Sequence, residues 1–255
     1  MKDQVIEESY SPWRAQVLVV KKDPKWRLCI DYSQTVNRFT EEDAFPIPRI
    51  DDLINNLAQN KYFSKYDLRS AYHQVPLIEN DKKYTAFEAK GKLYQFRRMP
   101  FGICNAVGAF QRIITKIVDE DNLESTYPYL DDVTIAANSL TELRENSKRF
   151  EESCEKRNMT INESKSIREA DCLNILGYQI KHQQISPDPN RLKPLMDIPI
   201  PSTTKELKRV RGLLAYYSKW IADFSTKMQL KHLMNTKKNL LLLFTFIKMY
   251  FSYDI

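Results

Sequence analysis

The sequence predicts an α+β fold in which antiparallel hairpins pack on amphipathic helices. The first observation is a set of apolar or aromatic runs that come in pairs around short turns, as in β-hairpins. These pairs are 15–20 with 26–31, 84–88 with 92–96, and 127–130 with 133–137. The second observation is apolar residues at helical spacing, which occur in 50–57, 105–118 and 140–157. The two kinds of segment alternate without an internal repeat, which favours a mixed architecture.

Length and composition set limits on the function. The 255 residues are enough for one large domain or two smaller ones. The formal net charge of +6 suggests an anionic partner such as nucleic acid, although an ordinary basic protein carries a similar charge. The four cysteines and three histidines have no zinc-ligand spacing, so a reduced, intracellular environment is expected. The longest apolar run, 240–247, is too short to cross a bilayer, and no membrane partner is expected.

The first hairpin joins a strand at 15–20 to a return strand at 26–31 through a polar turn. Its end gathers four cations, Lys21, Lys22, Lys25 and Arg27. Such a group could hold a triphosphate, because phosphate oxygens accept charge-assisted hydrogen bonds. A solvated basic hairpin tip explains the same residues equally well.

The middle of the chain alternates short strands with helices. After a break at Pro46 and Pro48, apolar spacing predicts a helix over 50–57. A strand at 62–67 then ends in Asp67, and a turn follows that enters a short helix. The next expected elements are a hairpin around Gly91, a breaker at 99–102 and a helix over 105–118.

The last third begins with Ser139 and Glu142, whose spacing is that of a capping box at the start of a helix. That helix is expected to reach about residue 157. A strand is predicted over 176–181 with a turn after it. Thr203 and Glu206 repeat the capping pattern before a final helix. Prolines between these segments favour a subdomain boundary within 190–202.

Three carboxylates mark a candidate site. Asp131 and Asp132 lie together in the turn of the third predicted hairpin, and Asp67 ends a predicted strand. If that strand pairs beside the hairpin, the three acids converge and suit two Mg²⁺ ions in phosphoryl or nucleotidyl transfer. The alternative is that Asp is a common turn residue and the side chains face water. Spacing alone does not show that the strands are neighbours.

An ordered series of short blocks resembles the reverse transcriptase segment of Ty3/gypsy-type LTR retrotransposon Pol polyproteins. The resemblance runs from about residue 11 to residue 228, and its specificity comes from the order of the blocks. They are Ser11-Pro12-Trp13, the run 26–32, the run 66–74, Met99-Pro100-Phe101-Gly102 with Phe110-Gln111, Tyr129-Leu130-Asp131-Asp132, Leu176-Gly177-Tyr178, Pro187-Asp188-Pro189 and the run 212–217.

This resemblance implies a right-hand polymerase fold of fingers, palm and partial thumb, with an antiparallel palm sheet packed on helices. Residues 1–190 would form fingers and palm, with the first fingers segment incomplete. Residues 191–228 would begin the thumb or connection. The tail, 229–255, departs from the family pattern, as a frameshift or a truncated copy would produce. Ser33 also departs from it, because the family usually has arginine there.

The resemblance also implies roles for single residues. Asp67, Asp131 and Asp132 match the catalytic, metal-binding triad. The residues that match those binding the incoming dNTP are Lys21, Arg27, Tyr72 as the steric gate, Phe101 and Gly102. Leu176, Gly177 and Tyr178 match the hairpin that positions the primer, and Lys165 matches a lysine proposed to protonate pyrophosphate. Without the resemblance, Tyr72 reads as a half-buried helix residue and Lys165 as an exposed loop lysine.

The expected function is that of an RNA-directed DNA polymerase fragment, which adds dNTPs to a primer on an RNA or DNA template. Two Mg²⁺ ions are the expected cofactor, with Mn²⁺ as an alternative. The rival is an inactive retroelement remnant that only binds nucleic acid. The three acids favour activity, whereas the abnormal chain ends favour the remnant.

Overall fold

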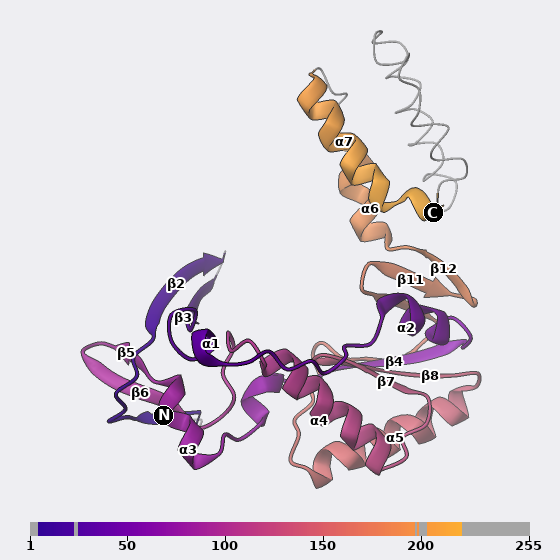
Figure 1. The fold of residues 1–255 in the computed structure, drawn as a ribbon. Coiled ribbons are helices and arrows are strands. Elements are labelled where there is room, and N and C mark those ends of the chain that lie inside the picture. The colour runs from indigo at the N-terminus through magenta and orange to yellow at the C-terminus, as the bar shows by residue number, and fades with distance from the viewer. Residues whose placement is uncertain (1–4, 23–24, 197, 199–202, 221–255) are drawn as a thin grey trace. The chain divides into compact units, whose positions relative to one another are not determined.

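The computed structural model describes residues 5–22, 25–196, 198 and 203–220 (Figure 1). The chain forms two compact units. The first contains the described residues up to Leu53 together with Asn60–Ala170. The second contains Ile54–Gln59 and the described residues from Asp171 onward. The predicted tail at 229–255 lies outside the described residues.

A four-stranded antiparallel sheet forms the centre of the first unit, in the order β7-β8-β4-β9. Its strands are β4 (Tyr62–Asp67), β7 (Thr126–Tyr129), β8 (Asp132–Ala137) and β9 (Ile167–Ala170). In β8 every residue after Asp132 is buried, as expected for a strand inside a sheet rather than at its edge. The predicted strand at 62–67 and the predicted hairpin around Asp131 are therefore confirmed.

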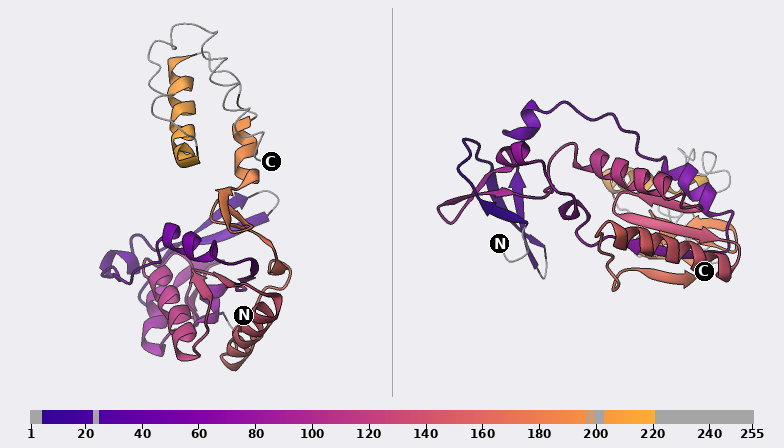
Figure 2. Two further views of the ribbon diagram at one scale, coloured as in Figure 1. Left: turned by 90° about the vertical axis from the view of Figure 1, so that its right-hand side faces the viewer. Right: turned by 90° about the horizontal axis from the view of Figure 1, so that it is seen from below.

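Two long helices, α4 (Ala106–Glu120) and α5 (Leu140–Lys156), lie on one side of this sheet (Figures 1 and 2). Their apolar stripes provide fully buried Phe110, Ile114, Leu143 and Phe150 to one core with the sheet residues. Ser139 caps α5 as predicted, because its Oγ accepts a hydrogen bond from the Glu142 N–H at 3.3 Å. This core fixes the strand edges that carry the acidic residues.

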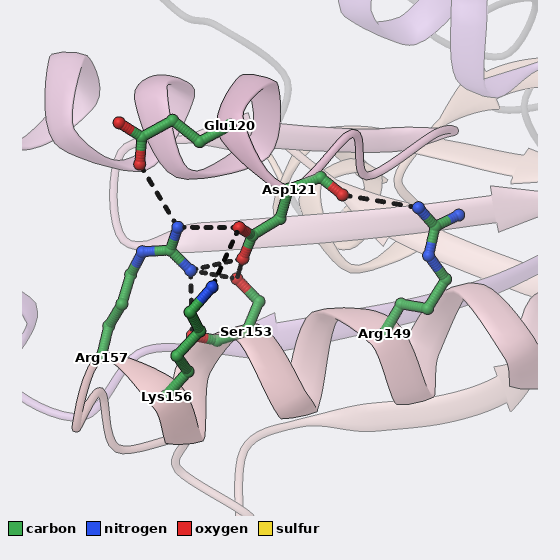
Figure 3. A network of polar contacts seen from close by, with 6 residues as sticks. All are labelled: Glu120, Asp121, Arg149, Ser153, Lys156 and Arg157. Atoms are coloured by element: carbon green, nitrogen blue, oxygen red, sulfur yellow. Dashed lines mark hydrogen bonds and ion pairs between the residues drawn. The ribbon is translucent and has the colours of Figure 1, made fainter.

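A polar network around Asp121, which follows α4, joins the C-terminal end of α4 to the C-terminal part of α5 (Figure 3). The Arg157 guanidinium donates to both Asp121 carboxylate oxygens, and the Ser153 hydroxyl donates to Asp121 Oδ2 at 2.6 Å. Arg149 donates to the Asn122 carbonyl at 2.7 Å. The hydrogen bonds from Arg157 and Ser153 hold the pKa of the Asp121 carboxyl well below its usual range. The network therefore ties the end of α4 to α5.

The N-terminal part of the same unit adds two smaller sheets. Strands β1 (Ile6–Glu8), β6 (Lys92–Phe96) and β5 (Phe87–Ala89) form one, and β2 (Gln16–Lys22) with β3 (Lys25–Asp31) forms the other. A second core of Ala15, Tyr32, Phe87 and Phe96 supports them. Short helices α1 (Val36–Phe39) and α3 (Glu79–Lys82) complete this part.

Most predicted elements of the first unit are confirmed, with two shifts in their bounds. The 15–31 hairpin and the 105–118 helix occur as predicted. The strand predicted at 84–88 begins only at Phe87, because Lys83–Thr85 forms a 3₁₀ turn. The short helix predicted before residue 74 is also a single 3₁₀ turn, Ala71–Gln74.

The second unit is a three-stranded meander with helices. Its strands are β10 (Cys172–Ile175), β11 (Tyr178–Lys181) and β12 (Gln184–Pro187), and its helices include α6 (Pro189–Met196) and α7 (Thr204–Tyr216). The predicted helix α2 (Ile50–Leu57) is confirmed, and its residues Ile54 and Leu57 are buried. Thr203 and Glu206 form the predicted capping box with reciprocal bonds of 3.2 and 3.3 Å. No helix among the described residues is both long and apolar enough to cross a bilayer.

The prediction of a strand over 176–181 is wrong at its start. Leu176 and Gly177 form the turn between β10 and β11, with φ angles of +51° and +90°. Both values lie in the left-handed region, which glycine adopts freely and which is outside the geometry of a regular strand. The strand therefore begins at Tyr178.

Candidate active site

The acidic turn between β7 and β8 contains Leu130 and Asp131, with Tyr129 paired to Asp132 across the hairpin. Leu130 has a φ of +56°, which is uncommon for a residue with a branched side chain. The Leu130 N–H donates to Oε1 of Gln111 at 2.8 Å, and Gln111 Nε2 donates to the Pro128 carbonyl at 3.1 Å. A fully buried side chain of α4 therefore holds both sides of this turn.

Strand β4 lies directly beside β8, so the neighbouring strands that the site requires are present. Asp67 is paired with Asp132 in this register, and the Leu68 N–H donates to the Asp131 carbonyl at 3.0 Å. The three carboxylates therefore come from the end of β4, the start of β8 and the turn that precedes β8. Rigid strands that support reacting groups favour precise positioning.

Asp67 is held by the loop that contains Asn162. Asn162 Nδ2 donates to Asp67 Oδ1 at 2.8 Å, and the Asn162 N–H donates to the Asp67 carbonyl at 2.8 Å. The Asp67 N–H donates to Ser166 Oγ at 3.2 Å. Lys165 Nζ lies 3.3 Å from Asp67 Oδ2 and keeps most of its side chain exposed. The strand end and this loop thus fix the Asp67 carboxylate.

Asp132 has a different partner. Its Oδ2 lies 2.8 Å from Lys65 Nζ, and both side chains are largely covered. Lys65 is two residues before Asp67 on β4, so the two side chains leave the strand on the same face. The ammonium group of Lys65 therefore balances the charge of the third acid.

A cavity of about 980 Å³ opens at this edge of the sheet. The cavity is lined by seven of the predicted site residues: Arg27, Asp67, Tyr72, Phe101, Gly102, Asp131 and Lys165. Lys21 and Asp132 are not part of its lining. The fold therefore brings most of the predicted catalytic and dNTP-binding residues to one hollow.

Aromatic rings form one wall of this cavity. The Tyr72 ring lies 5.0 Å from the Phe101 ring and 5.5 Å from the Phe110 ring, between centroids. Burial, with a smaller contribution from the Asp131 charge, raises the pKa of Tyr72. His73 stacks on Phe96 and has Nδ1 3.2 Å from the Met99 carbonyl, and burial lowers the His73 pKa. Both polar rings are therefore neutral near pH 7.

Gly102 adopts a φ of +95°, and a Cβ atom there would lie 3.2 Å from the Ile30 carbonyl oxygen. Its own carbonyl accepts a hydrogen bond from Asn37 Nδ2 at 2.8 Å. Both the conformation and the close backbone approach favour glycine at this position.

The predicted primer-positioning residues lie in the second unit. Leu176 and Gly177 form a turn, and Tyr178 begins β11 with a largely buried side chain. A Cβ atom on Gly177 would lie 2.7 Å from Nη1 of Arg191, which covers the turn. The Tyr178 ring also contacts the Trp220 ring and the Lys219 ammonium group.

The chemistry of the donor set suits a hard divalent cation, because Asp67 and Asp131 direct carboxylates to the same cavity. Within the part of the chain that the structure describes, no group of three or more His, Cys, Asp or Glu side chains is arranged to hold a metal ion. Asp67 and Asp132 are instead paired with the lysines at 165 and 65.

Three residues of the site carried no role in the sequence analysis: Gln111, Asn162 and Lys65. Gln111 follows Phe110 on a helix face that is otherwise apolar, and a polar residue at a buried position indicates a specific hydrogen-bonding role. Lys65 has the two-residue spacing that places it on the face of Asp67. Asn162 lies in a polar loop, where no local pattern distinguishes it.

Comparison with known protein families matches residues 19–180 to "Reverse transcriptase (RNA-dependent DNA polymerase)". Among curated relatives, the retrovirus-related Pol polyproteins from transposons opus and gypsy of Drosophila melanogaster are 33% and 31% identical, each over 88% of this chain. The transposon Tf2-3 polyprotein of Schizosaccharomyces pombe is 28% identical over 92% of this chain. The chain spans 23%, 22% and 17% of these relatives, respectively, which are therefore much longer proteins.

Comparison with solved structures gives the foamy viral protease-reverse transcriptase. Its complex with double-stranded DNA matches with a TM-score of 0.84 at 21% identity, over 97% of this chain and 46% of that one. Its complex with an RNA/DNA hybrid matches with a TM-score of 0.79 at 21% identity, over 96% and 34%. The predicted α+β, right-hand polymerase fold is thereby confirmed.

Proposed function

Because this chain belongs to the reverse transcriptase (RNA-dependent DNA polymerase) family, we propose that it adds dNTPs to a primer end as the polymerase segment of a retrotransposon Pol polyprotein. One observation carries this proposal. Asp67 and Asp131 face the same cavity as Arg27 and Tyr72, so acidic and phosphate-binding groups surround a space large enough for a nucleotide.

Asp67, Asp131 and Asp132 are the proposed ligands of two Mg²⁺ ions, with Mn²⁺ as an alternative. Bound there, the ions would activate the primer hydroxyl and neutralise charge on the departing pyrophosphate. The protein contributes the position of the carboxylates, because Asn162 and the β4–β8 register fix Asp67. In-line attack depends strongly on such fixed geometry.

The remaining dNTP contacts are proposed as follows. Lys21 and Arg27 bind the triphosphate, and Tyr72 excludes a ribose 2′-hydroxyl by its ring. Phe101 and Gly102 lie beneath the new base pair, where Gly102 lets the backbone approach closely. Lys165, at 3.3 Å from Asp67, is the proposed proton donor to pyrophosphate.

Nucleic acid binding extends this proposal. Residues 1–190 would provide the fingers and palm, and 191–228 the start of the thumb. Leu176, Gly177 and Tyr178 would position the primer on an RNA or DNA template. The names of the solved relatives, which include complexes with double-stranded DNA and an RNA/DNA hybrid, support a nucleic acid partner.

A second candidate is a remnant that binds nucleic acid without catalysis. The observation in its favour is that Lys65 and Lys165 already satisfy two of the three carboxylates. It predicts binding that weakens as salt increases, because phosphate contacts release counterions. It also predicts no primer extension.

Primer extension on poly(rA)/oligo(dT) separates the two candidates. The chain is assayed with Mg²⁺ and with Mn²⁺, beside Asp131→Asn and the surface control Asp119→Asn, whose side chain is exposed on α4. Extension by the wild type and by Asp119→Asn, but not by Asp131→Asn, is the expected result. Salt-sensitive binding without extension under either metal would overturn the polymerase proposal and favour the remnant.

A further inference from the structure

We propose that Gln111 is a positioning residue, which holds the Asp131 turn in its left-handed conformation and so sets the site of the metal-binding carboxylate. This inference rests on the proposed function, because the turn matters for catalysis only if Asp131 is a catalytic residue. Gln111 itself lies outside the reacting groups, since it is absent from the cavity lining among the described residues.

Both the oxygen and the nitrogen of the Gln111 side-chain amide form hydrogen bonds to the turn. Oε1 accepts from the Leu130 N–H at 2.8 Å, and Nε2 donates to the Pro128 carbonyl at 3.1 Å. Nε2 also lies 3.3 Å from the Thr115 hydroxyl, one helical turn along α4. A buried amide with satisfied donor and acceptor groups has its orientation fixed by its partners.

Leu130 has a backbone conformation that needs support from its surroundings. Its φ of +56° is unfavourable for a residue with a Cβ atom, so surrounding contacts must hold it. The hydrogen bond to Gln111 falls on the N–H of this same residue. Leu130 immediately precedes Asp131, so a relaxation of its backbone would redirect the Asp131 side chain.

Asp131 is also held by a backbone hydrogen bond that does not involve Gln111. The Leu68 N–H donates to the Asp131 carbonyl at 3.0 Å. Gln111 and β4 therefore hold the turn from two elements that are far apart in sequence. Loss of the Gln111 bonds would leave the β4 contact intact, and the turn would be displaced rather than the whole hairpin unfolded.

The decisive variant is Gln111→Met, which keeps length and volume and removes both hydrogen bonds. Ile114→Val is the matched control, because it removes a methylene from a fully buried side chain of the same helix and leaves both hydrogen bonds of Gln111 to the turn in place. We expect Gln111→Met to lower kcat by about 10- to 100-fold, because small misplacements of reacting groups have effects of this size. The KM for dNTP should change by less than about twofold, because Arg27 and Tyr72 are untouched.

A rescue experiment separates positioning from general destabilisation. In the Gln111→Met background, Leu130→Gly removes the Cβ atom that makes the left-handed turn unfavourable. Recovery of about three- to tenfold in kcat is expected if Gln111 acts through this backbone, because glycine removes part of the cost of the left-handed conformation. A purely structural role for Gln111 would give no recovery, since Leu130→Gly adds no packing.

Hydrogen exchange of residues 126–132 tests the same inference without catalysis. Gln111→Met should accelerate amide exchange in this segment and leave the exchange of residues 62–66 unchanged. Ile114→Val should not accelerate exchange specifically in the turn. Unchanged exchange at the turn, or a kcat loss matched by Ile114→Val, would overturn the inference. If the wild type fails to extend primers, the polymerase proposal fails, while the exchange data still decide whether Gln111 holds the turn.

Discussion

Tyr72 combines an aromatic ring at the cavity wall with a hydroxyl that burial keeps protonated. Its edge-to-face contact with Phe101 and its contact with Phe110 limit the positions that the ring can occupy. A ring held in this way can exclude a substituent by volume, because its two aromatic neighbours restrict its movement.

Tyr72→Val should therefore relax sugar discrimination. We expect the ratio of dNTP to rNTP incorporation, as kcat/KM, to fall by about tenfold or more, because one steric contact accounts for a difference of that order. Tyr72→Phe keeps the ring and should retain discrimination. Single-nucleotide incorporation with dTTP and UTP measures the ratio, and an unchanged ratio in Tyr72→Val would show that another residue selects the sugar.

At the scale of residues, the sequence predicts the carboxylates of the site better than it predicts the side chains that hold them. Asp67 and Asp131 are recognisable because one ends an apolar strand and the other lies in a hairpin turn. Asn162 reaches Asp67 across 95 positions, and such a contact depends on tertiary structure rather than on local pattern. Lys65 could be placed on the face of Asp67, but its bond to Asp132 depends on the register of β4 and β8.

At the scale of elements, the Asp121 network joins α4 to α5 (Figure 3). Asp121→Asn should lower the melting temperature at pH 7, because it removes the charge that pairs with Arg157. Asp119→Asn, two residues earlier on α4 and exposed, is the control and should leave the melting temperature unchanged. Equal melting temperatures for the two variants would contradict a stabilising role.

The same network predicts a pH dependence. The folded-state pKa of Asp121 is depressed, so its stabilisation is present above the unfolded value near 3.9 and is lost as pH falls through the folded value. The difference in free energy of unfolding between the wild type and Asp121→Asn should therefore become smaller as the pH falls below about 3. Chemical denaturation at pH 7 and at low pH measures the difference, and a difference that grows in acid would refute this assignment.

The turn between β10 and β11 shows why a strand prediction shifted by two residues. Leu176 continues an apolar run, so periodicity extends the strand back over it, but Gly177 marks the actual turn. Two features favour glycine at this position. The φ angle is positive, and a Cβ atom would lie very close to the Arg191 guanidinium.

Gly177→Ala should destabilise the protein by about 1–2 kcal/mol, because a positive φ is unfavourable for a residue with a Cβ atom. The side chain of Arg191 is exposed and can move away from the added methyl group, so the close approach of its guanidinium should add little to this cost. Gly91→Ala is the matched control, since Gly91 has a φ of +71° and no atom within 4 Å of an added Cβ. Urea unfolding of the wild type and the two variants measures both costs, and a cost for Gly177→Ala well above that for Gly91→Ala would show that Arg191 does not move aside.

At the scale of the whole molecule, the division into two units could not be derived from the sequence. The compact units divide between Ala170 and Asp171, which no feature of the sequence marks, and the boundary that the prolines predict within 190–202 stays a prediction. The segment Ile54–Gln59 belongs to the second unit although it lies early in the chain. Its apolar spacing predicts the helix correctly, but spacing holds no information about which core receives the helix.

Each unit has buried residues of its own, for example Phe110 in the first and Ile180 in the second. We therefore expect two unfolding transitions rather than one. With Trp13 and Trp26 replaced by phenylalanine, Trp220 fluorescence reports the second unit alone. Phe110→Leu should lower the transition seen by far-UV circular dichroism and leave the Trp220 transition in place, and coincident shifts would contradict independent units.

The ion pairs of Asp67 with Lys165 and of Asp132 with Lys65 have a consequence for handling the protein. In zinc fingers the metal supplies the folding energy, and a chelator unfolds them. Here ammonium groups of the chain itself are counterions to Asp67 and Asp132, so two of the three carboxylates at the sheet edge are balanced without a divalent cation. Purification in EDTA should therefore yield folded protein with an unchanged melting temperature, and loading with metal becomes a separate step that displaces lysines rather than one that builds the fold.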